Sequence, residues 1–182
     1  AHAAEYDVDS GRVALLGTSS GGHLAALAGL AAAPSAPSPS WQPSCGDPAA
    51  DVRVQAVVSC FGPLDLAFHA QESKGAQRIV TTFLGQPCQD APDLCAAASP
   101  VTYVTADAPQ ALLIHGADDD AVSCENSERM HAALQAAGAE AVYLPIEGAQ
   151  HSFIFKFQTE EAQVALNGIE DFLAEAFSTN RR

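Results

Sequence analysis

The sequence predicts an α/β fold in which helices flank a parallel β-sheet. Short apolar segments alternate along the chain with segments of helical pattern. The strand-like segments are apolar throughout instead of on alternate residues, which is typical of a parallel sheet covered on both faces. The length of 182 residues fits one domain, and the chain shows no internal repeat.

The first third of the chain is expected to provide two strands and two helices. We expect a helix at 1–6, a strand at 12–17, a helix at 20–32 and a strand at 53–60. The segment at 33–43 is rich in proline and serine, so it is expected to be a loop.

The rest of the chain is predicted to continue this alternation. A broken helix over the sheet edge is expected at 64–84, and residues 87–108 are expected to be mostly loop with a short helix. The last four elements are a strand at 111–115, a helix at 124–137, a strand at 140–145 and a helix at 159–177. The last helix repeats apolar residues at helical spacing, and Thr159 can cap its first turn.

The turn between the first strand and the second helix is the most informative segment. Gly17-Thr18-Ser19-Ser20-Gly21 has the pattern G-x-S-x-G. A nucleophile elbow requires this context, in which a sharp and strained turn exposes the serine at a helix N-terminus. Glycines at 17 and 21 are expected to leave room for the turn. Ser19 is the candidate nucleophile and the Ser20 backbone N–H the candidate oxyanion donor; the alternative is an ordinary Gly/Ser turn.

An acid and a base are predicted further along the chain. Asp118, Asp119 and Asp120 follow the strand at 111–115, and His151 follows the strand at 140–145. Loops at the carboxyl ends of the strands carry function in open α/β sheets. Serine, then aspartate, then histidine, each just past a strand, is the order found in α/β-hydrolases.

These motifs resemble those of a known family. Over nearly its whole length, the chain is similar to the α/β-hydrolase esterases close to hormone-sensitive lipase and to the feruloyl-esterase-like carboxylesterases. The matching segments are the elbow at 17–24, F-G-P-L-D-L at 61–66, A-S-P-V-T-Y-V at 98–104, H-G-A-D-D-D-A-V at 115–122 and G-A-Q-H-S-F at 148–153. The resemblance implies an α/β-hydrolase fold, with Ser19 as nucleophile, Asp119 as acid and His151 as base.

Two departures from the family pattern affect these expectations. The family carries an H-G-G-G-type segment upstream of the elbow, which supplies further oxyanion donors, whereas this sequence starts with a predicted helix. We therefore expect 1–182 to be the C-terminal part of an α/β-hydrolase domain, completed by a missing N-terminal half or by another copy. The strand at 12–17 should then show an uncovered apolar edge. Ser59-Cys60 also replaces the Asp-Trp common in relatives, beside the substrate pocket.

Several other side chains are candidates for binding or for packing. Phe61, Leu64 and Phe153 either bind substrate by lining the acyl pocket or pack in the core. The remaining histidines are expected to be structural or packed (His23, His115) or to lie at the surface (His2, His69, His131).

The composition restricts partners and cofactors. The chain has 22 Asp and Glu against 8 Lys and Arg, a net charge of −14, which disfavours nucleic acid and anionic membranes as partners. No apolar run reaches the roughly 18 residues of a membrane span. The carboxylates at 118–120 could suggest a cation site, but no further ligands follow at metal spacing. We therefore expect no metal and no other cofactor.

The cysteines bear on stability and on compartment. None of the five is spaced as C-x-x-C. Cys88 and Cys95 flank a short loop and could form a disulfide, whereas Cys60 ends an apolar strand and is expected to be a buried thiol. One cysteine must stay free or pair between chains. Because a disulfide indicates an exported protein, a secreted or periplasmic location is slightly favoured over the cytosol.

The sequence predicts a serine hydrolase that cleaves small carboxylic esters through an acyl-enzyme. A peptidase similar to prolyl oligopeptidase is an alternative, because the same three residues serve both reactions. Such peptidases usually carry a propeller or another gating module, which this sequence does not contain. A non-catalytic binding module or inert fragment is a further alternative, favoured by the missing N-terminal half and opposed by the complete Ser-Asp-His set.

Overall fold

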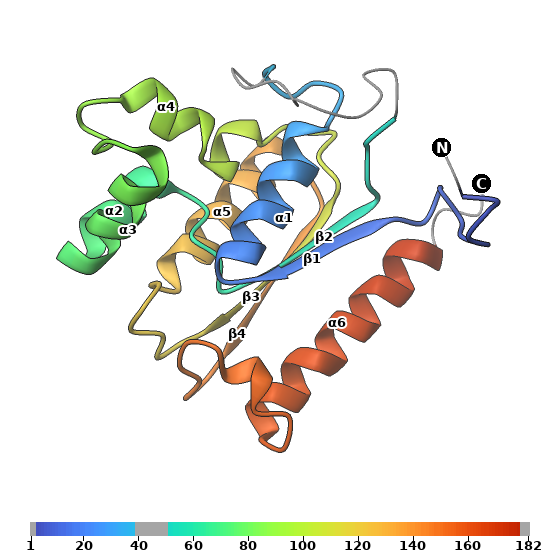
Figure 1. Ribbon diagram of the computed structural model, residues 1–182. Coiled ribbons are helices and arrows are strands. Elements are labelled where there is room, and N and C mark those ends of the chain that lie inside the picture. The colour runs from blue at the N-terminus through green and yellow to red at the C-terminus, as the bar shows by residue number, and fades with distance from the viewer. Residues whose placement is uncertain (1–2, 39–50, 179–182) are drawn as a thin grey trace.

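The computed structural model describes residues 3–38 and 51–178, which form a four-stranded parallel sheet flanked by helices (Figure 1). The strands are β1 (Ala14–Thr18), β2 (Ala56–Cys60), β3 (Gln110–Gly116) and β4 (Ala141–Ile146). They lie in the order β1-β2-β3-β4, so each strand pairs with the one that follows it in the chain. This architecture confirms the predicted α/β fold class.

Helices cover both faces of the sheet (Figure 1). The helices α1 (Ser20–Ala31) and α5 (Glu125–Ala137) lie on one face, and α6 (Glu160–Ser178) lies on the other. Neighbouring strand residues point to opposite faces, so Val57 packs with α1 and α5 while Val58 packs with α6. The strands are apolar throughout because they fill both layers of the core.

The broken helix expected at 64–84 consists of two helices. The helices α2 (Leu66–Glu72) and α3 (Lys74–Leu84) meet at Ser73, whose hydroxyl oxygen caps the first turn of α3. The short helix α4 (Pro92–Ala97) follows, and a 3-10 turn at Pro100–Tyr103 packs against α1. In Figure 1 these green helices lie together on one side of the molecule.

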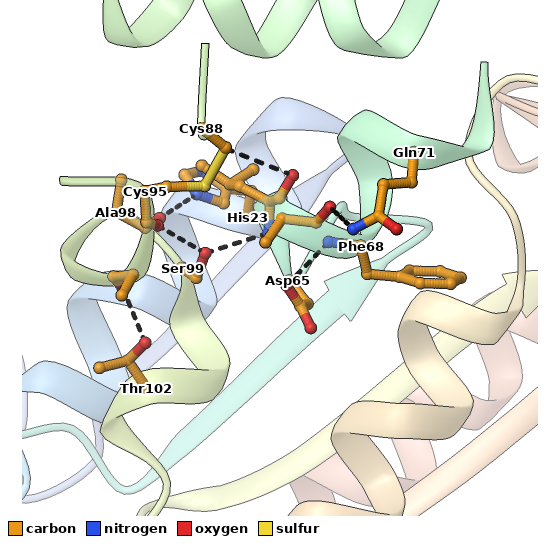
Figure 2. Close-up of a disulfide and its surroundings, with 12 residues drawn as sticks. His23, Asp65, Phe68, Gln71, Cys88, Cys95, Ala98, Ser99 and Thr102 are labelled. Atoms are coloured by element: carbon orange, nitrogen blue, oxygen red, sulfur yellow. Dashed lines mark hydrogen bonds between the residues drawn. A yellow bond between two sulfur atoms is a disulfide. The ribbon is translucent and has the colours of Figure 1, made fainter. Parts of the chain in front are cut away.

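A disulfide between Cys88 and Cys95 closes the loop between α3 and α4, with an S–S distance of 2.03 Å. The bridge that the sequence suggested is therefore confirmed. Figure 2 shows that it lies close to His23 of α1. The His23 Nε2–H donates to the carbonyl oxygen of Ala98 at 2.8 Å, and Ser99 Oγ donates to the carbonyl oxygen of Cys95 at 2.7 Å. The disulfide thus holds α4 where it meets the helix that follows Ser19.

The start of the described chain differs from the prediction. Residues 3–7 form turns and not the end of a helix, and the expected helix at 1–6 otherwise lies outside the described residues. The side chains of Tyr6 and Val8 are exposed. A segment of one or two turns is not stable as a helix without an apolar face packed on the core.

Strand β1 lies at one edge of the sheet in the described part of the chain. Every residue of β2 is buried, whereas no residue of β1 is, and Leu16 keeps 51% of its surface exposed. Leu16 pairs in register with Val58, so it points to the face that α6 covers further along the sheet. The expected uncovered apolar edge is therefore confirmed.

Three further expectations can be compared with the structure. Cys60 is buried, which confirms the prediction of a buried thiol, and burial raises the pKa of this thiol to about 12. Cys124 is a free, partly exposed thiol, whereas Cys45 lies outside the described residues. The surface position expected for His69 is wrong, because this side chain is buried against Glu72.

Candidate active site

Ser19 occupies a strained turn between β1 and α1. Its backbone has φ 53° and ψ −123°, a conformation that is costly for a residue with a side chain. Its N–H donates to the carbonyl oxygen of Cys60 at 2.8 Å, which ties the turn to the end of β2. A strained, partly exposed serine between a strand and a helix is the geometry that the G-x-S-x-G pattern predicts.

The glycines around Ser19 differ in what they contribute. A Cβ on Gly17 would lie 2.0 Å from the carbonyl oxygen of Gly21, so the close approach of these two backbones requires glycine at 17. A Cβ on Gly21 would meet nothing within 4 Å, which corrects the expectation that a side chain there would clash. Gly22 was not singled out from the sequence, yet a Cβ there would lie 2.8 Å from Ser59 Oγ.

His151 and Asp119 complete a hydrogen-bonded row with Ser19. Ser19 Oγ lies 3.0 Å from His151 Nε2, and His151 Nδ1 lies 2.7 Å from Asp119 Oδ2. Because a carboxylate accepts hydrogen bonds, the His151 proton resides on Nδ1 and leaves Nε2 free to accept the serine proton. The three residues that the sequence singled out are thus brought together from the ends of β1, β3 and β4.

The Asp119 carboxylate is held by several donors. Its Oδ1 accepts from the backbone N–H groups of Ala121 and Val122, each at 2.9 Å. Burial alone raises the pKa of this carboxyl group, but the hydrogen bonds from His115, Val122, His151 and Ala121 outweigh it and lower the pKa to about 2. Asp119 is therefore a fixed negative charge behind His151 at neutral pH. In contrast, the neighbouring Asp118 and Asp120 are exposed.

An aromatic side chain packs against His151. The rings of Phe61 and His151 meet edge to face, with centroids 4.9 Å apart, and Phe153 lies 5.7 Å from Phe61. Phe61, Leu64 and Phe153 are all buried, and Leu64 belongs to the core layer of α1 and α5. This burial favours core packing over the acyl-pocket interpretation, because a covered side chain presents no surface to a ligand.

The N-terminus of α1 lies directly after Ser19. Ser20 is the first residue of α1 and is exposed. The first N–H groups of a helix have no partner within the helix, and the helix dipole adds partial positive charge there. This end of α1 can therefore accept a negative charge that develops beside Ser19 Oγ.

Two hollows in the described structure lie away from this row. One of about 750 Å³ is lined by residues such as Ser10, Arg53 and Pro109, which precede the strands. Another of about 440 Å³ is an apolar groove between α1, α3 and α4. Neither is lined by Ser19, Asp119 or His151. Within the described residues, no group of three or more His, Cys, Asp or Glu is arranged to hold a metal ion, and no helix is long and apolar enough to cross a bilayer.

The fold and the row of Ser19, His151 and Asp119 define the α/β-hydrolase class. Residues 1–134 match the BD-FAE family, and the chain belongs to this family. It is 34% identical to the probable carboxylic ester hydrolase LipM of Mycobacterium tuberculosis (strain ATCC 25618 / H37Rv), over 98% of this chain and 41% of LipM. It is 35% identical to the esterase LipQ of the same organism, over 93% of this chain and 39% of LipQ. The chain thus spans about two fifths of these relatives' length.

Solved structures of esterases are similar in fold. A truncated carbohydrate esterase from gut microbiota matches with a TM-score of 0.79 and 27% identity, over 96% of this chain and 63% of that one. A thermophilic esterase of Thermogutta terrifontis with propionate bound matches with a TM-score of 0.74 and 26% identity, over 96% of this chain and 59% of that one. The chain therefore has the α/β-hydrolase fold that its motifs resemble.

Proposed function

We propose that this chain carries the catalytic residues of a carboxylesterase that works through a Ser-His-Asp triad and an acyl-enzyme. The hydrogen-bonded row from Ser19 through His151 to Asp119 carries the proposal. Each neighbour in this row is within hydrogen-bond distance, the serine lies on a strained turn, and the acid is ionised at neutral pH. The family's esterases support ester hydrolysis as the reaction class.

The first half of the proposed reaction forms the acyl-enzyme. His151 Nε2 takes the hydroxyl proton of Ser19 as Oγ attacks the ester carbonyl carbon, which gives a tetrahedral oxyanion. The backbone N–H of Ser20, at the N-terminus of α1, donates to this oxyanion. The imidazolium then gives its proton to the leaving alcohol as the ester C–O bond breaks, and the acyl group stays on Ser19.

The second half of the reaction returns the enzyme to its starting state. A water molecule attacks the acyl carbon while His151 removes its proton, and the C–O bond to Ser19 breaks as Oγ regains a proton from His151. The products are a carboxylic acid and a free serine. In both halves the Asp119 carboxylate stabilises the imidazolium and holds its Nδ1–H in place.

The proposed substrates are small esters with short acyl groups. This choice draws on the similar Thermogutta terrifontis esterase, which has been solved with propionate and with butyrate bound. The buried rings of Phe61 and Phe153 also fill the space behind His151 with protein. The activity is proposed for the natural polypeptide that carries this sequence.

The experiment compares Ser19→Ala with Ser35→Ala in that polypeptide. Ser35 is exposed, and its backbone is tied to Asp107, ahead of β3 and away from the triad. We expect Ser19→Ala to reduce the hydrolysis of p-nitrophenyl acetate and butyrate by about 10⁴-fold or more, and Ser35→Ala to leave it unchanged. A fluorophosphonate probe should label Ser19 alone, as located by peptide mass spectrometry.

Two results would contradict the proposal. Hydrolysis or labelling that persists in Ser19→Ala would remove this serine from the reaction. Faster cleavage of peptide nitroanilides than of p-nitrophenyl esters would instead assign the triad to a peptidase.

A further inference from the structure

A second histidine lies behind Asp119 and takes no part in the proposed proton transfers. His115 is the last residue but one of β3, ahead of the loop that carries Asp119, and its side chain is fully buried. Its Nε2 lies 2.9 Å from the carbonyl oxygen of Val122 and 3.4 Å from Asp119 Oδ2. Its Nδ1 lies 2.8 Å from Ser127 Oγ, on α5. Both ring nitrogens therefore have partners.

These partners define the tautomer of His115. Both groups near Nε2, a carbonyl oxygen and a carboxylate oxygen, can only accept hydrogen bonds, so Nε2 carries a proton. The Ser127 hydroxyl at Nδ1 can donate, so a neutral ring with Nδ1 unprotonated satisfies every contact. His115 therefore presents an N–H to the acid loop while Ser127 fixes the ring from the other side.

The His115 side chain contacts both Val122, which binds one carboxylate oxygen of Asp119, and the other carboxylate oxygen itself. The Val122 carbonyl accepts from His115, and the Val122 N–H donates to Asp119 Oδ1 at 2.9 Å. His115 thus fixes the residue that holds one carboxylate oxygen and also approaches the other oxygen directly. That other oxygen, Oδ2, is the one bound to His151.

We propose that His115 is a positioning residue, which orients the Asp119 carboxylate and through it the imidazole of His151. This inference rests on the proposed function and deepens it, because it adds a member behind the triad. A buried histidine that only packs would hold β3 and α5 together without affecting the contact between Asp119 and His151. The two roles predict different behaviour of His151.

A matched pair of substitutions separates the two roles. The side-chain nitrogen of His115→Gln can reach the place of Nε2 and donate to Val122 and Asp119, whereas His115→Asn reaches only the place of Nδ1. If His115 positions the acid, His115→Asn frees the carboxylate to rotate and weakens its bond to His151 Nδ1. We expect kcat for p-nitrophenyl acetate to fall roughly 10- to 100-fold in His115→Asn, and most of it to be restored in His115→Gln.

The pH profile provides a second readout. The titratable groups that face Asp119 in the described structure are His115 on β3, His151 after β4 and the Cys124 thiol before α5. A weaker bond to Asp119 stabilises the His151 imidazolium less, so the acidic limb of kcat/KM should move to lower pH in His115→Asn. If the acidic limb of kcat/KM does not move, His115 only packs in the core. If it moves to higher pH, His115 acts as a positive charge near His151 and does not position Asp119. Either result overturns the proposal.

Nuclear magnetic resonance makes the test independent of turnover. The His151 titration, followed by imidazole shifts, should show the same downward movement in His115→Asn with no substrate present. The nitrogen shifts of His115 in the unmodified protein should report the Nε2–H tautomer, which tests the proposal even if the variants do not fold. A protonated Nδ1 with a bare Nε2 would overturn it. Failure of the proposed function is distinguished because it would appear as ester hydrolysis insensitive to Ser19→Ala.

Discussion

Gly116, at the end of β3, lies against the backbone of Ala149 in the loop that carries His151. A Cβ on Gly116 would come within 2.3 Å of the Ala149 carbonyl oxygen. That oxygen accepts from the N–H of Asp118 at 3.0 Å, so the two loops are joined beside this contact. The loops that bring Asp119 and His151 together can approach because one of them has no side chain at this point.

The substitution Gly116→Ala tests this contact. The new methyl group must push the two loops apart, because the nearest atoms belong to backbone. We expect kcat for a p-nitrophenyl ester to fall by about 100-fold, with a lower melting temperature. Gly75→Ala is the matched control, since its Cβ would meet only Ser73 Oγ at 3.5 Å, an ordinary contact. Equal activity in the two variants would show that the loops can part without loss.

The choice of Asp119 among three adjacent carboxylates gives a second prediction. Asp119→Asn keeps the shape of the side chain but no longer fixes the His151 tautomer, so we expect kcat to fall by orders of magnitude, to about 10⁻⁴ of its value. Asp118→Asn and Asp120→Asn should change it little, because both side chains are exposed. A loss concentrated in Asp118→Asn would place the acid one residue earlier.

The low pKa of Asp119 links stability to pH. Hydrogen bonds lower this pKa from 3.8 to about 2 in the folded protein. A depressed pKa stabilises the fold above the unfolded value near 4 and loses this contribution as pH falls towards 2. We expect the free energy of unfolding to lose about 1–2 kcal/mol over this interval through Asp119. Urea titrations at pH 5 and at pH 2 measure the free energy of unfolding of the natural protein and of Asp119→Asn. An equal loss of this free energy in the two proteins would contradict the prediction.

The disulfide gives a prediction on stability and on compartment. Replacing both Cys88 and Cys95 by alanine should lower the free energy of unfolding by about 2–3 kcal/mol, as chain-entropy estimates give for so short a loop. Cys124→Ala, at a free and partly exposed thiol, should change it by less than about 0.5 kcal/mol. We also propose an oxidising compartment for the protein. If peptide mapping finds both thiols free in protein from its native host, the Cys88–Cys95 disulfide and the oxidising compartment are both rejected.

The open edge of β1 predicts self-association of the isolated 182-residue chain. Leu16 on this strand and Val13 just before it are exposed, and an uncovered apolar edge pairs readily with another. Leu16→Asp should therefore shift the chain towards monomer in sedimentation velocity. Val142→Asp is the control, because Val142 is 50% exposed on β4, whose edge Pro145 already interrupts. A monodisperse monomer without any substitution would refute the prediction.

The sequence was informative where function depends on local pattern. Ser19 could be found because its strained turn needs a glycine at position 17. The strands could be found because their side chains are buried on both faces of the sheet and are therefore apolar. His151 and Asp119 follow strand ends, where a parallel sheet gathers its loops. These features leave a signal in consecutive residues.

Other features depend on how segments fold and pack in three dimensions, and they left no such signal. Glu72 lies one helical turn from His69, but the burial of this pair accompanies a contact from Asn126 of α5 to the Glu72 carboxylate, which the local sequence does not reveal. Phe61 was a candidate pocket residue, yet its ring is covered by His151 and Phe153. The link from His115 to Val122 lies within one short segment, but only the loop conformation turns it towards the acid.

The order β1-β2-β3-β4 has a consequence for synthesis on the ribosome. From β2 onward, each emerging strand finds its neighbour already made, so the described sheet can assemble in chain order while translation proceeds. The serine turn emerges before the acid, and His151 emerges after both, past β4. We therefore expect every nascent intermediate that stops short of residue 151 to lack the proposed base, so that its Ser19 hydroxyl is not activated.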